Sequence, residues 1–127
     1  MATEKKKIVL IIEDDKALKA VLADKLRTGG FDVLMASDGA EGLEIAFKEL
    51  PDIILLDIIM PKMNGVEMLR LLREAAWGKT VPVLFLTNDN EPERMMQALK
   101  INANDYLIKS DWALGDIVNK VKQTIGI

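Results

Sequence analysis

Short apolar runs alternate with longer segments of helical periodicity along this chain of 127 residues. The runs cover residues 8–12, 31–36, 53–56, 81–86 and 106–108, and most of their residues are branched or aromatic. Short runs with apolar residues on both faces are typical of parallel strands buried inside a sheet. This pattern restricts the chain to folds that cover both faces of a parallel sheet.

Between and after the runs, apolar residues recur at helical spacing over 18–26, 43–50, 66–76, 95–99 and 114–125. Five strand signals that alternate with five helix signals predict an α/β fold. The expected architecture is a five-stranded parallel sheet, doubly wound, with five helices on both faces. Because no repeat or linker interrupts the alternation, we expect a single domain over residues 1–127.

The composition excludes several kinds of chemistry. The chain has no histidine and no cysteine, which excludes a thiol nucleophile, a Ser-His-Asp triad and an ordinary zinc site. Its net charge of -3 gives no indication of nucleic-acid or anionic-membrane binding. The apolar runs are too short for a membrane span or a signal peptide, so we expect a cytoplasmic protein.

Polar residues follow most of the strand-like runs. In an open parallel sheet, ligands bind beyond the carboxyl ends of the strands, so these residues are candidates for a site. They are Glu13, Asp14 and Asp15 after the first run, Asp57 after the third, Thr87 after the fourth and Lys109 after the fifth. The second run ends in Ala36 and Ser37, with no obviously chemical group.

Each candidate also has a simpler interpretation. Asp14 or Asp15 could cap the following helix, and Asp57 could be a turn residue. Thr87 could be an ordinary strand residue and Lys109 a solvated one. Together, however, three carboxylates, a hydroxyl and an ammonium group at one rim favour Mg²⁺ beside a phosphoryl group. Asp57 would then be the nucleophile, because a carboxylate can accept phosphate as an acyl phosphate.

With Pro61, Gly65 and Tyr106, this set of residues resembles the receiver domain of response regulators over essentially the whole chain. The resemblance is to the stand-alone, CheY-like type and implies a flavodoxin-like fold. It implies the following roles: Asp57 as phosphoryl acceptor, Glu13, Asp14, Asp57 and the Ile59 carbonyl as Mg²⁺ ligands, Thr87 and Lys109 as phosphoryl contacts, and Thr87 and Tyr106 as switch residues.

The resemblance implies a part in two-component signal transduction. Asp57 would accept a phosphoryl group from a sensor histidine kinase, with Mg²⁺ as cofactor. Phosphorylation would switch partner binding or self-association through the fourth helix, fifth strand and fifth helix, without direct nucleic-acid or membrane contact. The chain would not be an enzyme beyond its own phosphorylation and dephosphorylation. Asn88 replaces the small residue usual in the family, and Ile59 and Asp89 occupy positions that tune dephosphorylation.

Three alternatives stay open. A Mg²⁺-dependent phosphatase with an aspartyl nucleophile would need a carboxylate two residues after Asp57, where Ile59 stands. A flavodoxin-like electron carrier would need a phosphate-binding loop after the first run, where acids stand instead. A receiver-like scaffold that is not phosphorylated would not need the complete set of acid, hydroxyl and lysine groups.

Overall fold

The computed structural model describes residues 6–58, 60, 62–87, 105–108 and 114–127. Its sheet is parallel and has the strand order β2-β1-β3-β4-β5. The strands are β1 (Ile8–Ile12), β2 (Asp32–Ala36), β3 (Ile53–Leu56), β4 (Val83–Thr87) and β5 (Asp105–Ile108). The order of the strands reverses between β1 and β3, which makes their carboxyl ends the topological switch point of the sheet.

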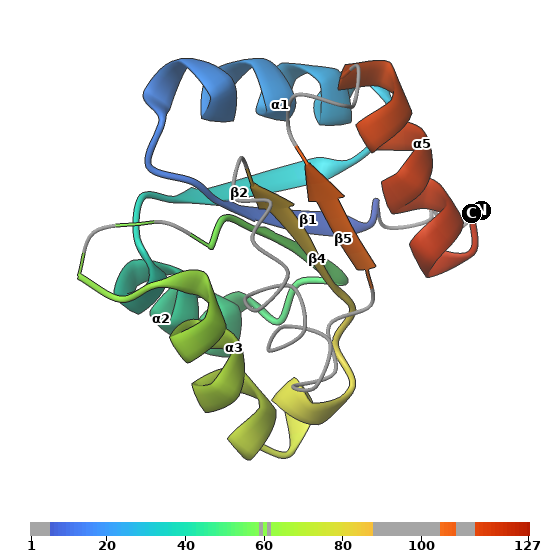
Figure 1. The fold of residues 1–127 in the computed structure, drawn as a ribbon. Helices are drawn as coiled ribbons and strands as arrows, with labels where there is room; N and C mark the ends of the chain where they lie inside the picture. The colour runs from blue at the N-terminus through green and yellow to red at the C-terminus, as the bar shows by residue number, and fades with distance from the viewer. Residues whose placement is uncertain (1–5, 59, 61, 88–104, 109–113) are drawn as a thin grey trace.

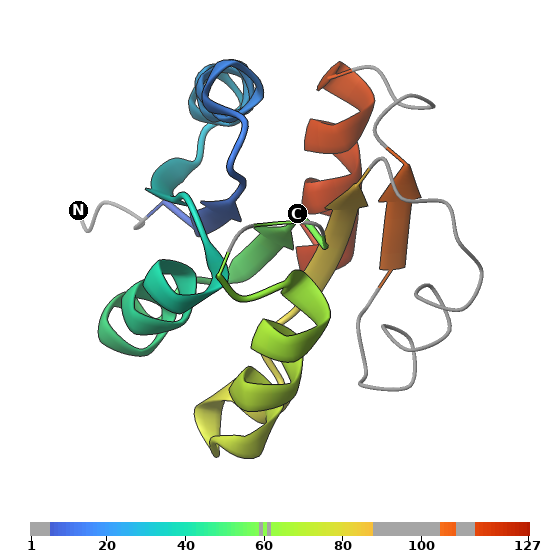
Figure 2. The same ribbon diagram turned by 60° about the vertical axis from the view of Figure 1, so that its left-hand side comes forward.

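Helices cover both faces of this sheet. They are α1 (Lys16–Thr28), α2 (Gly39–Glu49), α3 (Gly65–Glu74) and α5 (Leu114–Ile125), with a short 3₁₀ helix η1 (Trp77–Lys79) after α3. Figures 1 and 2 show α1 and α5 on one face and α2 and α3 on the other. The doubly wound α/β fold is therefore confirmed. The helix predicted around 95–99 lies outside the described residues.

The core consists of two layers, one on each face of the sheet. In β1, Val9 and Ile11 belong to the layer shared with α1 and α5, whereas Leu10 and Ile12 belong to the layer shared with α2 and α3. All four are buried. Because successive side chains of a strand point to opposite faces, covering both faces requires an uninterrupted apolar run. This requirement explains why the strands could be recognised in the sequence.

The first three helices all begin with a side-chain cap. The capping carboxylate or amide oxygens accept backbone N–H groups as follows: Asp15 from Leu18 at 3.1 Å, Asp38 from Glu41 at 2.8 Å and Asn64 from Glu67 at 2.8 Å. Such caps satisfy backbone donors that have no partner within the helix. At its other end α1 stops at Gly29, as the Gly29-Gly30 pair predicts, and Gly30 has a φ of 98°.

Two strands begin later than their apolar runs. The sequence predicts strands from residues 31 and 81, but β2 begins at Asp32 and β4 at Val83. The N–H of Phe31 donates to the Leu26 carbonyl at 3.0 Å, so this residue closes the end of α1. Pro82 has no N–H for the sheet ladder and cannot extend β4. Among the described residues, no helix combines the length and apolar character needed to cross a membrane.

Candidate metal centre

Three carboxylates lie together at the switch point of the sheet. Glu13 and Asp14 follow β1 and Asp57 follows β3, and one oxygen of each lies within 4.8 Å of the other two. The sheet causes this proximity, because Ile12 pairs with Leu56 and the Asp57 N–H donates to the Ile12 carbonyl at 3.0 Å. The predicted convergence of these three acids is therefore present in the fold.

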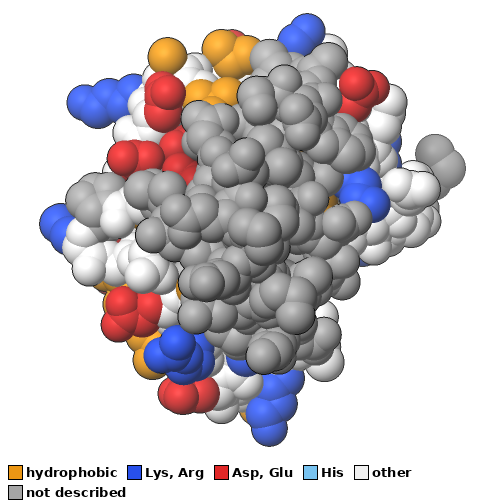
Figure 3. Space-filling view, in the orientation of Figure 1, with side chains coloured by type: hydrophobic (Ala, Val, Ile, Leu, Met, Phe, Trp, Pro, Cys, Tyr) orange, Lys and Arg blue, Asp and Glu red, His pale blue; other side chains and the backbone are white. Residues whose placement is uncertain are grey.

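The cluster is largely enclosed. Glu13 is 2% and Asp57 5% exposed, whereas Asp14 is exposed. In Figure 3, acidic side chains gather on the side of the molecule where α1 begins. Carboxylates this close repel one another. A divalent cation that takes their oxygens as ligands offsets the repulsion. An all-oxygen set with one exposed member, Asp14, fits Mg²⁺, which retains several waters when it binds protein carboxylates.

Asp14 and Asp15 have two different roles, as expected if Asp14 belongs to the metal site and Asp15 caps the following helix. The Asp15 side chain accepts the Leu18 N–H and caps α1. Asp14, one position earlier, contributes its carboxylate to the cluster instead. The Asp15 backbone also takes part, since its N–H donates to Glu13 Oε2 at 3.1 Å. The start of α1 thus helps to hold one acid of the cluster in place.

The start of α3 lies directly beside Asp57. The Gly65 N–H donates to the Ile58 carbonyl at 2.8 Å. This hydrogen bond joins the two ends of the connection between β3 and α3. A Cβ atom at position 65 would overlap the Asp57 carbonyl oxygen and lie 2.9 Å from Ile58 Cα. Glycine therefore permits this close backbone contact, which is a physical reason for Gly65 in the motif.

The other predicted site residues are described in part or not at all. Thr87 is the last residue of β4, the strand beside β3, and it pairs with Ile108 of β5. Tyr106 lies in β5, where it pairs with Phe85. The side chains of Thr87 and Tyr106, and the whole of Ile59 and Lys109, lie outside the described residues. The roles of these four residues stay predictions.

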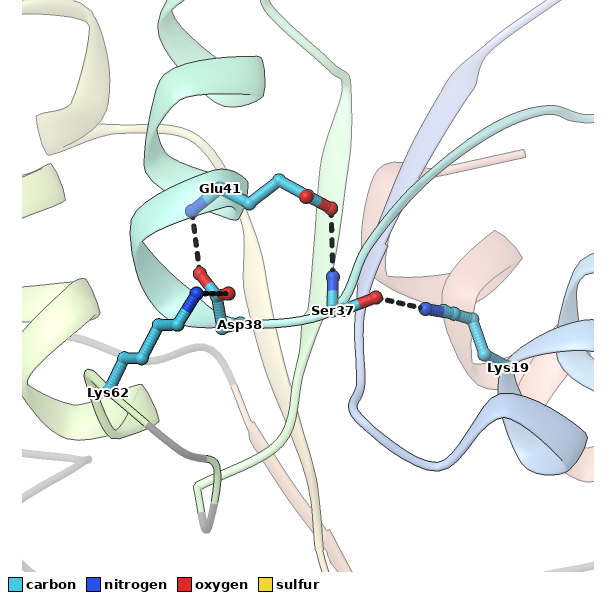
Figure 4. Close-up of polar contacts among 5 residues, drawn as sticks. All are labelled: Lys19, Ser37, Asp38, Glu41 and Lys62. Atoms are coloured by element: carbon cyan, nitrogen blue, oxygen red, sulfur yellow. Dashed lines mark hydrogen bonds and ion pairs between the residues drawn. The ribbon is translucent and has the colours of Figure 1, made fainter.

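A set of polar contacts around Ser37 and Asp38 was not predicted (Figure 4). Lys19 Nζ of α1 donates to Ser37 Oγ at 2.7 Å, and Lys62 Nζ lies 3.5 Å from Asp38 Oδ2. The hydrogen bond from the Glu41 N–H, aided by the Lys62 ammonium group, lowers the pKa of Asp38, although partial burial acts in the opposite direction. The available signal was Asp38 followed by Glu41, the spacing of a capping box.

The fold and the acid cluster together define a class of protein. It is a doubly wound α/β domain with a cluster of three carboxylates at the switch point of its sheet. Residues 9–122 match the sequence profile of the response regulator receiver domain. The chain therefore belongs to the receiver domain family of two-component signalling, as the resemblance in its motifs predicts.

Two curated relatives illustrate the match. The chain is 36% identical over 103 residues to the alkaline phosphatase synthesis transcriptional regulatory protein PhoP of Bacillus subtilis, covering 81% of this chain and 42% of that protein. It is 40% identical over 114 residues to the transcriptional regulatory protein PrrA of Mycobacterium tuberculosis, covering 90% and 48%. The chain thus spans about half the length of the curated relatives it matches.

Solved structures share the fold over almost their whole length. The chemotaxis protein CheY4 of Vibrio cholerae superimposes with a TM-score of 0.88 at 27% identity, covering 94% of this chain and 99% of that one. A CheY-like receiver domain protein of Methanospirillum hungatei gives 0.89 at 26% identity, covering 95% and 94%. These similarities confirm the flavodoxin-like, CheY-like architecture.

Proposed function

We propose that this chain accepts a phosphoryl group on Asp57 from a sensor histidine kinase, with Mg²⁺ as cofactor. The observation that carries the proposal is the position of Asp57. It is a buried carboxylate at the end of β3, beside Glu13 and Asp14, in a chain of the receiver family. Family membership supplies the chemistry, and the acid cluster supplies a place for the cation.

In the proposed transfer, a carboxylate oxygen of Asp57 attacks the phosphorus atom of a phosphohistidine. The bond from phosphorus to the imidazole nitrogen breaks, an acyl phosphate forms, and the leaving nitrogen keeps the electron pair and takes up a proton. The donor histidine must belong to another molecule, because this chain has none. Bound Mg²⁺ would supply positive charge to the phosphoryl oxygens.

The other predicted residues complete the proposal. Glu13, Asp14, Asp57 and the Ile59 carbonyl would hold the cation, and Thr87 and Lys109 would contact the phosphoryl oxygens. Hydrolysis of the acyl phosphate would return the chain to its starting state. The chain would therefore catalyse its own phosphorylation and dephosphorylation, and it would not turn over a separate substrate.

The output would be a change in binding. We propose that phosphorylation acts through Thr87 and Tyr106 on the face formed by the predicted fourth helix, β5 and α5, which then binds a partner or a second copy. The curated relatives are named as transcriptional regulators and are about twice as long as the matched region. We do not propose that the residues of this receiver domain bind DNA.

The experiment is phosphorylation by acetyl phosphate in Mg²⁺, followed by intact mass measurement. We expect one added phosphoryl group in the wild-type chain and none when Mg²⁺ is chelated. Asp57→Asn should show no adduct, whereas Asp24→Asn, a change on the exposed surface of α1, should behave like the wild type. A stable adduct that persists in Asp57→Asn would contradict the assignment of the acceptor.

A further inference from the structure

The turn between β2 and α2, residues 36–38, is connected to both sides of the acid cluster. On one side, the Glu13 N–H donates to the Ala36 carbonyl at 3.0 Å. On the other, the Asp38 carboxylate pairs with the Lys62 ammonium group, which belongs to the connection between β3 and α3 (Figure 4). That connection leads directly from Asp57. The turn therefore joins the two strand ends that carry the cluster.

Lys62 adopts a backbone conformation that the pairing helps to explain. Its φ is 67°, in the left-handed region that residues other than glycine rarely occupy. Its side chain is 75% exposed, yet it reaches Asp38, whose side chain is only 13% exposed. A long, solvated side chain loses rotamer freedom when it is held in one place. The backbone conformation of Lys62 offsets part of this cost by directing the side chain toward Asp38.

The backbones of the two segments are also in contact beside the ion pair. A Cβ atom added at Gly39 would lie 2.8 Å from the Met63 carbonyl oxygen, which shows how closely α2 begins against the β3–α3 connection. At the base of the connection, the Gly65 N–H bonds the Ile58 carbonyl at 2.8 Å. The connection is therefore attached at its base, next to Asp57, and again at Lys62 and Met63.

We propose that the Asp38–Lys62 ion pair is a positioning device for the metal centre. The sheet brings Asp57 and Glu13 together, and the ion pair, by holding the β3–α3 connection against the β2–α2 turn, stabilises the separation that binds a divalent cation. Asp38 and Lys62 are thus positioning residues and touch neither cation nor phosphate. This inference rests on the proposed function in one respect, namely that the acid cluster binds Mg²⁺.

A simple charge effect makes a different prediction for Lys62. If Lys62 acted only as a positive charge near the acids, it would repel the cation, and its removal would strengthen Mg²⁺ binding. If it acts by position, its removal weakens binding. Loss of the Asp38 charge weakens binding in either case, so Lys62 is the residue that discriminates between the two effects.

The test measures the affinity of the full chain for Mg²⁺ by isothermal titration calorimetry. Lys62→Asn removes the charge but keeps a residue that tolerates positive φ, and Asp38→Asn keeps a good helix cap. We expect each change to raise the Kd about two- to fivefold, the range given by an exposed ion pair. The double variant should be no weaker than Asp38→Asn alone, because both changes remove the same interaction.

Lys62→Arg should bind Mg²⁺ with the affinity of the wild type, since it keeps the positive charge. Asp24→Asn, which breaks the 3.7 Å pair with Arg27 on α1, should leave the Kd unchanged. Tighter binding in Lys62→Asn, an unchanged Kd, or additive effects in the double variant would overturn the positioning role.

A second measurement separates this inference from the proposed function. If the wild-type chain binds no Mg²⁺, the proposed cation site is wrong. The positioning role of the ion pair is then tested in the metal-free protein. Amide chemical shifts of the metal-free protein should change at Glu13, Asp57 and Ile58 in Lys62→Asn but not in Lys62→Arg. Unchanged shifts at these three residues would overturn the positioning role as well.

Discussion

At the scale of single residues, Gly65 has no room for a side chain beside the acid cluster. A side chain there would collide with backbone atoms of Asp57 and Ile58 rather than with the flexible end of another side chain. Backbone atoms in a buried strand end have little freedom to move, since the interior is closely packed. Any larger residue must therefore displace the start of α3 from Asp57.

We expect Gly65→Ala to lower the free energy of unfolding by about 1–3 kcal/mol, the usual cost of overpacking. Gly115→Ala is the matched control, because an added Cβ there meets no atom of the described residues within 4 Å and the position lies in α5. This control should raise the free energy of unfolding by roughly 0.5 kcal/mol, because alanine loses less backbone entropy than glycine. Urea denaturation measures both. If the two variants were equally stable, the contact at Gly65 would not be tight.

At the scale of elements, the helices around the site differ in the chemistry of their caps. Asn64 at the start of α3 cannot titrate, but Asp38 at the start of α2 can. The pKa of Asp38 lies below its ordinary value of 3.8, chiefly because its carboxylate accepts the Glu41 N–H. A carboxyl whose pKa is lowered by folding stabilises the protein above its unfolded pKa. That contribution disappears as the pH falls through the folded pKa.

The stability of the domain on acidification should therefore depend in part on the Asp38 cap. In Asp38→Asn, the loss of free energy of unfolding between about pH 5 and pH 2.5 should be smaller than in the wild type, because asparagine caps a helix at any pH. At neutral pH the two proteins should be similar in stability. Denaturation at a series of pH values checks this, with Asn64→Asp as the converse variant. Parallel pH profiles for wild type and Asp38→Asn would contradict the prediction.

The elements also show what a sequence alone can predict here. The bounds of β1 and β3 follow from burial on both faces, which leaves a visible apolar run with a polar residue at each end. The acid cluster follows from topology, because parallel strands bring their carboxyl ends to one edge. The Asp38–Lys62 pair could not be predicted in this way. It joins residues far apart in the chain and depends on a positive φ and a close backbone contact at Gly39, and neither leaves a hydrophobic pattern.

At the scale of the whole molecule, the acid cluster lies at the ends of central strands that separate the two core layers. Glu13 and Asp57 follow β1 and β3, and each of these strands contributes buried residues to both layers. A cation that binds the folded cluster and not the unfolded chain stabilises the entire domain, by about 2.7 kcal/mol at a concentration 100 times the Kd. Stability therefore reports on the site without any phosphorylation.

Asp14 and Asp15 allow this coupling to be tested with adjacent residues. Asp15→Ala removes the cap of α1 and should lower the free energy of unfolding by about 1 kcal/mol, with or without Mg²⁺, while the gain on adding Mg²⁺ persists. Asp14→Ala should not lower the stability of the metal-free protein and should raise it by no more than about 0.5 kcal/mol, because the residue is exposed and its removal relieves repulsion within the cluster. It should nevertheless lose most of the gain from Mg²⁺, since it removes one of three clustered carboxylates. Urea denaturation of both variants and the wild type, with Mg²⁺ and with a chelator, gives the Mg²⁺ gain of each protein. An equal loss of the Mg²⁺ gain in both variants would contradict the division of roles between the two aspartates.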